Sequence, residues 1–188
     1  MKQIVNTWKI IGVAMLYVLT LYFSAFLGFL APLGWVCFPV VAAFLGAFSY
    51  FWIAVRWQKF GVGSLLALVF SAYLLQSGEG SWAEACVMMT AGILSDCIRR
   101  FIGNHKKKGA LYAYPALALG AFSWILRLWT DTQWYYDAAI DEMGIDYANG
   151  LMLFAKWWIF LLLLAIAAVA GLVGIGLSQK WMRVVFAE

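Results

Sequence analysis

The chain has 188 residues, of which 65% are apolar and 12% are charged, and its formal net charge is +4. An ordinary soluble domain has roughly 45–50% apolar and about 25% charged residues, so this composition excludes a water-soluble globular protein. The length suits one domain over residues 1–188, with lipid as the solvent of its apolar surface. We therefore predict an all-α integral membrane protein.

Six apolar segments are candidates to cross a hydrocarbon core about 30 Å thick. In chain order, we expect transmembrane helices over residues 8–30, 36–55, 62–75, 81–97, 110–128 and 151–177. The third is the shortest. We expect the first to be retained, because no small-residue cleavage site of a signal peptide accompanies it.

Turn and capping signals separate these helices. Residues 31–34 form a turn signal around Pro32 and Gly34, and residues 76–80 form a second one. Ser81 followed by Glu84 has the spacing of a capping box, which predicts that the fourth helix begins there. The polar segment 129–150 is the longest connection, and its aromatic and acidic residues suit a lid over a ligand as well as an ordinary interfacial loop.

Lys and Arg residues fall on one side of the expected topology. Of the 13, all except Arg127 and Lys156 lie at the termini, in the connection after the second helix or in the connection after the fourth. By the positive-inside rule this side is cytoplasmic, so both termini are expected inside. The basic run at 105–108 is either a stop-transfer cluster or a contact with anionic lipid. Because the positive charge follows topology, we expect no nucleic-acid partner.

Histidine and cysteine argue against an enzyme. His105 is the only histidine and lies in the basic turn, so no imidazole is expected among the transmembrane helices as a base or metal ligand. Cys37, Cys86 and Cys97 form no C-x-x-C motif, although a disulfide between the first two stays open. No phosphate-binding loop occurs either. We expect no catalytic residues, no cofactor and no metal, and any ATP hydrolysis would belong to partner proteins.

Three ionisable residues stand near the outer ends of the later helices, where a charge inside a helix is costly and commonly faces a cavity. Glu84, Arg127 and Lys156 are expected at similar depth, and the indoles of Trp82, Trp124 and Trp157 lie beside them in sequence. This combination predicts a shallow pocket for a small organic solute. The alternative is that Glu84 only caps its helix, the two bases reach lipid headgroups, and the indoles mark the interface.

The pattern as a whole resembles the substrate-binding S components of energy-coupling factor (ECF) transporters, and more narrowly their Trep_Strep or MptS-like group. Six helices in under 200 residues, a short third helix and a long outer fifth loop carry the likeness. So do the segments 81–85, 144–148 and 165–182. The likeness covers nearly the whole chain as a loose pattern.

The resemblance implies uptake of a micronutrient, such as a vitamin or its precursor, across a bacterial cell membrane. A membrane-embedded coupling (T) protein and two cytoplasmic ATPases would be the partners. The substrate would contact residues that include Asp146 and Tyr147 with those already named. Gating loops would hold Pro32, Gly34, Trp35, Gln76, Gly78 and Gly80. Small residues that permit close helix contact, Gly12, Ala14, Ala43 and Gly46, are the candidates for the surface that meets the coupling protein.

Rival hypotheses come from other classes. A scaffold subunit without a ligand would lose only stability when Glu84 or Arg127 is replaced. An intramembrane enzyme would need the outer acids as catalysts. A proton-coupled transporter is disfavoured by the absence of an internal repeat and of a midplane carboxylate.

Overall fold

The computed structural model describes residues 7–185, and over this range the chain consists of helices and short connections. In chain order, the elements are α1 (Thr7–Ala25), η1 (Phe26–Phe29), α2 (Pro32–Arg56), α3 (Val62–Ser77), α4 (Trp82–Ile102), α5 (Lys107–Leu119), η2 (Gly120–Ile125), α6 (Arg127–Thr130), α7 (Thr132–Met143), α8 (Ile145–Met152) and α9 (Trp157–Val185), where η marks a 3₁₀ helix. The all-α prediction is confirmed. Lys2, one of the basic residues that set the expected orientation, lies outside the described residues, and the side chain of Arg183 is not described.

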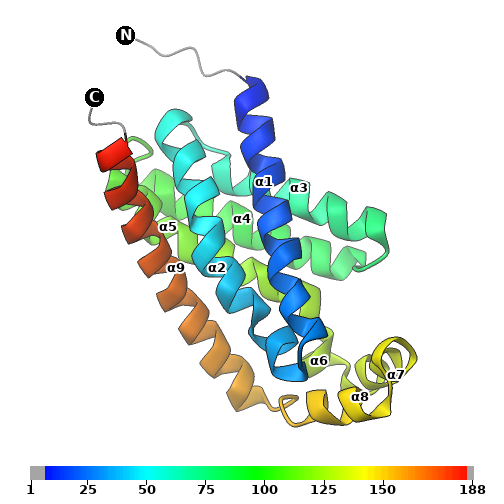
Figure 1. Cartoon of the computed structure of the whole chain (residues 1–188). Coiled ribbons are helices and arrows are strands. Elements are labelled where there is room, and N and C mark those ends of the chain that lie inside the picture. The colour runs from blue at the N-terminus through cyan, green and yellow to red at the C-terminus, as the bar shows by residue number, and fades with distance from the viewer. Residues whose placement is uncertain (1–6, 186–188) are drawn as a thin grey trace.

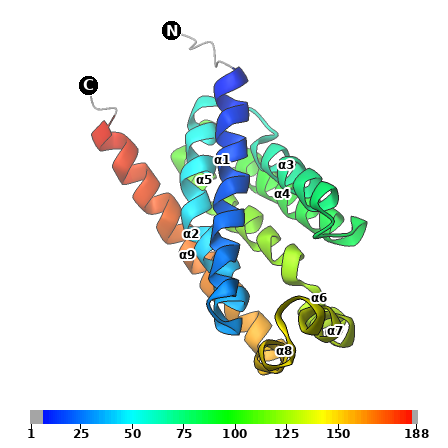
Figure 2. The ribbon, with the colours of Figure 1, turned by 45° about the vertical axis from the view of Figure 1, so that its right-hand side comes forward.

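Helix α2 is the centre of the bundle. It packs against α1, α5 and α9. In the most apolar 18-residue stretch of each long helical segment, the buried share is 61% for α2, 33% for the segment that contains α1 and 28% for α9. Figures 1 and 2 show α3 and α4 side by side and inclined to the long helices α1, α2 and α9. The start of α1 and the end of α9 lie at the same end of the bundle, called here the termini end (Figure 1).

The outer faces of α1 and α9 are apolar and exposed. Met15 and Phe23 of α1 and Leu161 and Val169 of α9 are each more than half exposed. Water would not stabilise such surfaces, but lipid tails do, since they are as apolar as these side chains. Three helical segments are long and apolar enough to span a membrane: Thr7–Phe29, Pro32–Arg56 and Trp157–Met182.

The other three predicted crossings differ from these in length or polarity. Helix α3 is apolar but has 16 residues, about 24 Å of α-helix against a hydrocarbon core of about 30 Å. Helix α4 has 21 residues but carries Glu84, Asp96 and two arginines. The fifth segment changes from α5 to the 3₁₀ helix η2 at Gly120. These crossings stay predictions.

Two predicted helix boundaries were wrong. Pro32 occupies the first turn of α2, where its missing N–H costs nothing, so the second helix begins at Pro32 and not near Val36. The last long helix begins at Trp157, because residues 145–152 form the separate helix α8 and a turn follows it. Lys156 therefore lies before α9, exposed, instead of inside a transmembrane helix.

Small residues allow the helices to cross closely. A Cβ added to Gly46 of α2 would stand 2.8 Å from the ring of Tyr17 and 2.9 Å from the hydroxyl of Tyr114. Ala14 and Ala43 are likewise buried in the core of this chain. Three of the four residues predicted to meet a coupling protein thus contact their own chain in this structure. Gly12 is exposed, and nothing lies within 4 Å of its added Cβ.

At the termini end, two charged residues of α4 hold the α2–α3 connection. The Asp96 carboxylate accepts hydrogen bonds from the Gly63 and Ser64 amides, both at 2.8 Å, and so caps the start of α3. The buried Arg99 guanidinium donates from Nη2 to the carbonyls of Ala54 (2.5 Å), Trp57 (3.1 Å) and Asn104 (2.8 Å).

Asp96 pairs with neither Arg99 nor Arg100, although both lie about one helical turn away. Among the side chains of residues 7–182 the structure has one ion pair, and it lies elsewhere. Asp96 and Arg99 instead satisfy backbone groups at the two helix ends of one connection. Those groups would otherwise be left without partners.

Candidate functional site

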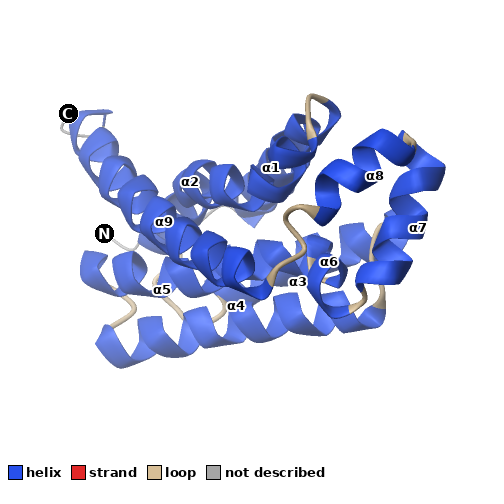
Figure 3. Cartoon of the chain, turned by 90° about the horizontal axis from the view of Figure 1, so that it is seen from below, coloured by secondary structure: helices blue, strands red, loops and turns tan. Residues whose placement is uncertain are grey.

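A cavity of about 330 Å³ opens at the end of the bundle opposite the termini, called here the cavity end. Its lining comes from nearly every element that reaches this end: Tyr22, Ala25, Phe26, Gly28, Phe29, Trp35, Gly78, Glu79, Gly80, Ser81, Glu84, Trp124, Arg127, Trp134, Tyr135, Ala138, Ala139, Glu142, Met143, Tyr147 and Leu151. Seen from below in Figure 3, α6, α7 and α8 are grouped on one side of this end. The volume is at the lower end of the range for small-molecule sites.

Trp124 of η2 joins this lining to the aromatic core. Its ring makes edge contacts with Trp35, Phe38, Phe70 and Tyr73, at centroid distances of 5.3–6.1 Å. The side chain is 7% exposed, and its indole N–H donates to Glu79 at 3.4 Å. Edge-to-face packing fixes the ring on several sides, so Trp124 is a rigid wall of the cavity.

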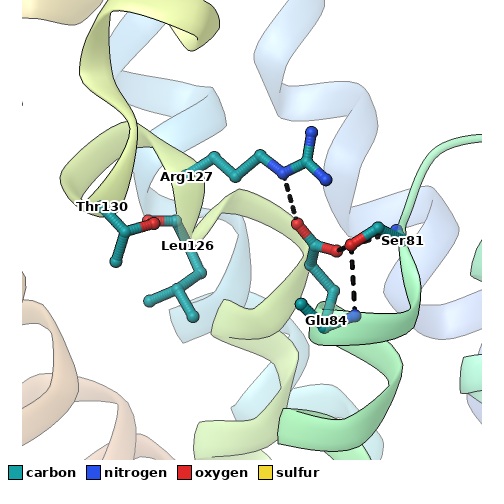
Figure 4. Close-up of polar contacts among 6 residues, drawn as sticks. Ser81, Glu84, Leu126, Arg127 and Thr130 are labelled. Carbon is teal, nitrogen blue, oxygen red and sulfur yellow. Dashed lines mark hydrogen bonds and ion pairs between the residues drawn. The ribbon is translucent and has the colours of Figure 1, made fainter.

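The carboxylate of Glu84 connects α4 to α6. Ser81 caps α4 and donates its amide to Oε2 of Glu84 at 2.8 Å, while the Ser81 hydroxyl contacts the same oxygen; the predicted capping box is confirmed. The second oxygen, Oε1, accepts a hydrogen bond from Nε of Arg127 at 2.6 Å (Figure 4). Glu84 therefore caps its helix and also forms an ion pair across the cavity wall.

The guanidinium of Arg127 makes two contacts and leaves its terminal nitrogens unbonded. Besides the bond from Nε, its guanidinium lies 4.2 Å from the ring centroid of Trp134, a cation–π distance. Neither terminal nitrogen has a hydrogen-bond partner within residues 7–185. Figure 4 shows these nitrogens on the far side of Nε from Glu84. They are available to a solute that enters the cavity.

Helices α7 and α8 cover the cavity from one side. Residues 134, 135, 138, 139, 142 and 143 line it, which is one face of α7 at helical spacing. The Tyr147 hydroxyl of α8 donates to the carbonyl of Gly28 in η1 at 2.7 Å. The indole N–H of Trp35 donates to the Tyr135 hydroxyl at 2.5 Å. These two bonds hold the helical cover to α2 and η1.

The Tyr135 phenol keeps its proton over the physiological range. Burial raises its pKa strongly, the hydrogen bond from Trp35 lowers it, and the neighbouring Tyr147, Glu142 and Glu79 raise it further. The neutral hydroxyl accepts one bond from Trp35, and no acceptor for its own hydrogen occurs within residues 7–185. Tyr135 can therefore donate one hydrogen bond to a bound solute.

The structure brings together part of the predicted site. Seven predicted residues line the cavity: Trp35, Gly78, Gly80, Glu84, Trp124, Arg127 and Tyr147. Seven do not line it: Pro32, Gly34, Gln76, Trp82, Asp146, Lys156 and Trp157. Trp82 and Trp157 are 76% and 56% exposed, as expected for indoles at a membrane interface. Pro32 and Gly34 lie in the first turns of α2, and Gln76 lies in α3.

Sequence reasoning missed several lining residues. Tyr22, Phe26 and Phe29 come from α1 and η1, where the sequence analysis predicted no substrate-binding residue. Trp134, Tyr135 and Glu142 come from the segment whose lid role stayed open. The helical spacing of 134, 138 and 142 in this segment was the signal that could have placed them on one face.

The chemical groups of the cavity lining include aromatic rings, carboxylates, a guanidinium and phenols. Over residues 7–185, no group of three or more His, Cys, Asp and Glu side chains is placed to hold a metal ion. The three cysteines are free thiols in the structure, so Cys37 and Cys86 are not paired. The cavity offers aromatic surface, one ion pair, two further carboxylates and unused hydrogen-bond donors.

Comparison with known proteins gives one match. A family model described as "Hypothetical bacterial integral membrane protein (Trep_Strep)" matches residues 4–187, nearly the whole chain. No curated protein and no solved structure matches the chain significantly.

Proposed function

This chain belongs to the Trep_Strep family of bacterial integral membrane proteins, and on that premise we propose that it is the substrate-binding S component of an ECF-type importer. It would bind a small micronutrient from outside the cell and deliver it through a membrane-embedded coupling protein driven by two cytoplasmic ATPases. The chain itself would not hydrolyse ATP.

The observation that carries the proposal is the cavity beside Glu84, Arg127 and Trp124. A ligand pocket of this kind has mostly apolar walls and a few polar groups that orient the solute. Eight of the lining residues are aromatic, and Arg127 and Tyr135 have unused donors. A scaffold subunit has no use for such a pocket.

The position of the cavity supports uptake from outside. It lies opposite the termini, and the basic residues from Arg56 to Lys59 and from Arg99 to Lys108 gather with the termini. If the positive-inside rule orients this bundle, the termini end is cytoplasmic and the cavity faces the exterior. The helical cover formed by α7 and α8 suits a gate that closes over substrate.

The experiment is purification of the tagged chain from its native bacterium in mild detergent, with mass spectrometry of what accompanies it. We expect a second membrane protein, two ATPases and a retained small molecule. Absence of both the membrane protein and the ATPases would overturn the importer proposal.

A matched pair of variants separates ligand binding from assembly. Trp124→Leu changes a cavity wall, whereas Trp82→Leu changes an exposed indole on the neighbouring helix. We expect the first to lose the small molecule while keeping the partner proteins, and the second to keep both. Loss of neither ligand nor partners in Trp124→Leu would contradict a binding role for the cavity.

A further inference from the structure

We infer that the solute held in this cavity is an organic cation, with its charge on a quaternary or protonated nitrogen beside an aromatic or alkyl body. This inference rests on the proposal that the cavity binds substrate, and it names the substrate's chemical class.

The first support is the charge balance of the lining. Three acidic side chains and one basic side chain line the cavity, namely Glu79, Glu84, Glu142 and Arg127. Arg127 and Glu84 neutralise each other at 2.6 Å. Glu79 and Glu142 have no ion-pair partner within residues 7–185. The lining thus carries two unpaired carboxylates and no unpaired base. A cation would neutralise this negative charge, whereas an anion would be repelled by it.

The two carboxylates are exposed, and each lies near an aromatic residue of the lining. Glu79 follows α3 at the turn that Gly78 begins, and it accepts the indole N–H of Trp124. Glu142 lies on the lining face of α7, two turns along from Tyr135. Both carboxylates act on the buried Tyr135 hydroxyl, although burial itself is the larger cause of its raised pKa. A cation near Tyr135 would therefore lie within the electrostatic reach of both acids.

The second support is the aromatic wall. Tyr22, Phe26, Phe29, Trp35, Trp124, Trp134, Tyr135 and Tyr147 line the cavity. The faces of such rings carry negative potential and attract a cation that lies over them. Trp134 already binds one cation in this manner, the guanidinium of Arg127. The same chemistry serves an organic cation that enters the cavity.

The cover over the cavity adds a field of the same sign. Asp131, Asp137, Asp141 and Asp146 are exposed on or beside α7 and α8. Lys156 is the one base in the connection that follows. Clefts bordered by one sign of charge raise the local concentration of the opposite ion and its rate of association.

The unused donors of Arg127 and Tyr135 complete the description. A carboxylate on the solute would satisfy Arg127 but would stand among Glu79, Glu84 and Glu142. A neutral acceptor, such as a carbonyl oxygen or a ring nitrogen, satisfies the same N–H groups without adding negative charge. The structure therefore fits a cation that also carries a neutral hydrogen-bond acceptor.

The test uses three probes of similar size on the purified, ligand-free full chain: phenyltrimethylammonium, neutral benzamide and anionic benzoate. Binding is measured by thermal shift and by calorimetry at low ionic strength. We expect the cation to bind at least about tenfold more tightly than benzoate. Tighter binding of benzoate or benzamide, or stabilisation by none of the three, would overturn the inference.

Variants of the unpaired acids make the test specific. The double variant Glu79→Gln and Glu142→Gln should weaken binding of the cation at least about tenfold. Asp137→Asn with Asp141→Asn is the matched control, because it removes equal charge at positions that are equally classed as exposed but do not line the cavity. Equal weakening in both double variants would show a surface field only, and would overturn the assigned contacts.

The molecule retained from native cells separates this inference from the proposed function. A retained cation supports both. A retained neutral or anionic compound overturns the inference and leaves the importer proposal intact. Cation binding without a coupling protein and ATPases leaves the inference intact and removes the importer.

Discussion

Both ends of the bundle contain charged side chains, yet these side chains are bonded differently at the two ends. At the termini end, the buried Asp96 carboxylate and the terminal nitrogens of the buried Arg99 bond to backbone groups of the α2–α3 connection and Asn104, while Nε of Arg99 has no partner among the described residues. At the cavity end, Arg127 keeps both terminal nitrogens free, and Glu142 has no ion-pair partner within residues 7–185.

The difference teaches how to separate structural from functional charge in a membrane protein. A buried charge whose hydrogen bonds go to the chain itself stabilises the fold, because each bond replaces one that water would have made. A charge that lines a cavity and keeps unused donors can bind a solute. By this criterion the charges of the termini end are structural, and those of the cavity end are what the proposed binding site requires.

The largest effect is expected when the hydrogen bonds of Arg99 at the termini end are removed. Arg99→Met leaves the carbonyls of Ala54, Trp57 and Asn104 without their donor, and each buried polar group left unsatisfied costs about 1–3 kcal/mol. We expect a large fall in the thermal midpoint in detergent. Ligand bound per folded molecule should not change.

Arg100→Met is the control for this variant, because its side chain is exposed on the next position of the same helix. Equal midpoints for the two variants would contradict the role assigned to Arg99.

The second effect concerns the cavity wall. Trp124→Leu removes an indole that four aromatic rings and Glu79 hold in place. We expect at least about a tenfold loss of ligand affinity, equal to about 1.4 kcal/mol, by calorimetry with the ligand identified from native cells.

Trp82→Leu should leave that affinity unchanged, because Trp82 is 76% exposed and does not line the cavity. This comparison also tests the sequence-based assignment of Trp82 to the binding site. A tenfold loss of ligand affinity in Trp82→Leu would show that Trp82 belongs to the binding site after all.

The third effect measures the ion pair. A double-mutant cycle of Glu84→Gln and Arg127→Gln isolates the coupling between side chains whose exposures are 7% and 31%. Because Arg127 is partly solvated, we expect a coupling free energy of unfolding of about 1 kcal/mol. Additive effects of the two substitutions would mean that Glu84 acts only as a helix cap.

The smallest effect concerns the cover. Tyr147→Phe removes the bond to the Gly28 carbonyl, worth about 0.5–1.5 kcal/mol. We expect faster hydrogen exchange in α8 and faster ligand release. Tyr136→Phe is the control, because Tyr136 bonds to Asn149 within the cover itself. Faster release in the control alone would contradict this account.

Local signals allowed part of the site to be predicted. The capping box followed from the spacing of Ser81 and Glu84. The pairing of Glu84 with Arg127 did not, because 43 residues separate them and the contact depends on how η2 and α6 continue α5. The spacing placed both residues at one depth but could not show that they touch.

The errors at Lys156 and in the fifth predicted helix have one physical origin, which is the assumption of uninterrupted helices. The depth predicted for Lys156 followed from a transmembrane helix that was expected to begin at Leu151, whereas α9 begins at Trp157. Gly120, where α5 gives way to η2, meets Met88 and Ala91 of α4 so closely that an added Cβ would stand 2.6 Å from the Met88 sulfur. Such close approaches come from tertiary packing and leave no periodic signal in the sequence.

The cover has a consequence for how this family could diversify. Residues 132–152 form a continuous segment that supplies 8 of the 21 lining positions, and they contribute little to the core between the long helices. Gly144, with φ of +90°, separates α7 from α8 inside it. Exchange of residues 132–152 between homologues should therefore transfer ligand preference, while the long helices of the bundle fold unchanged.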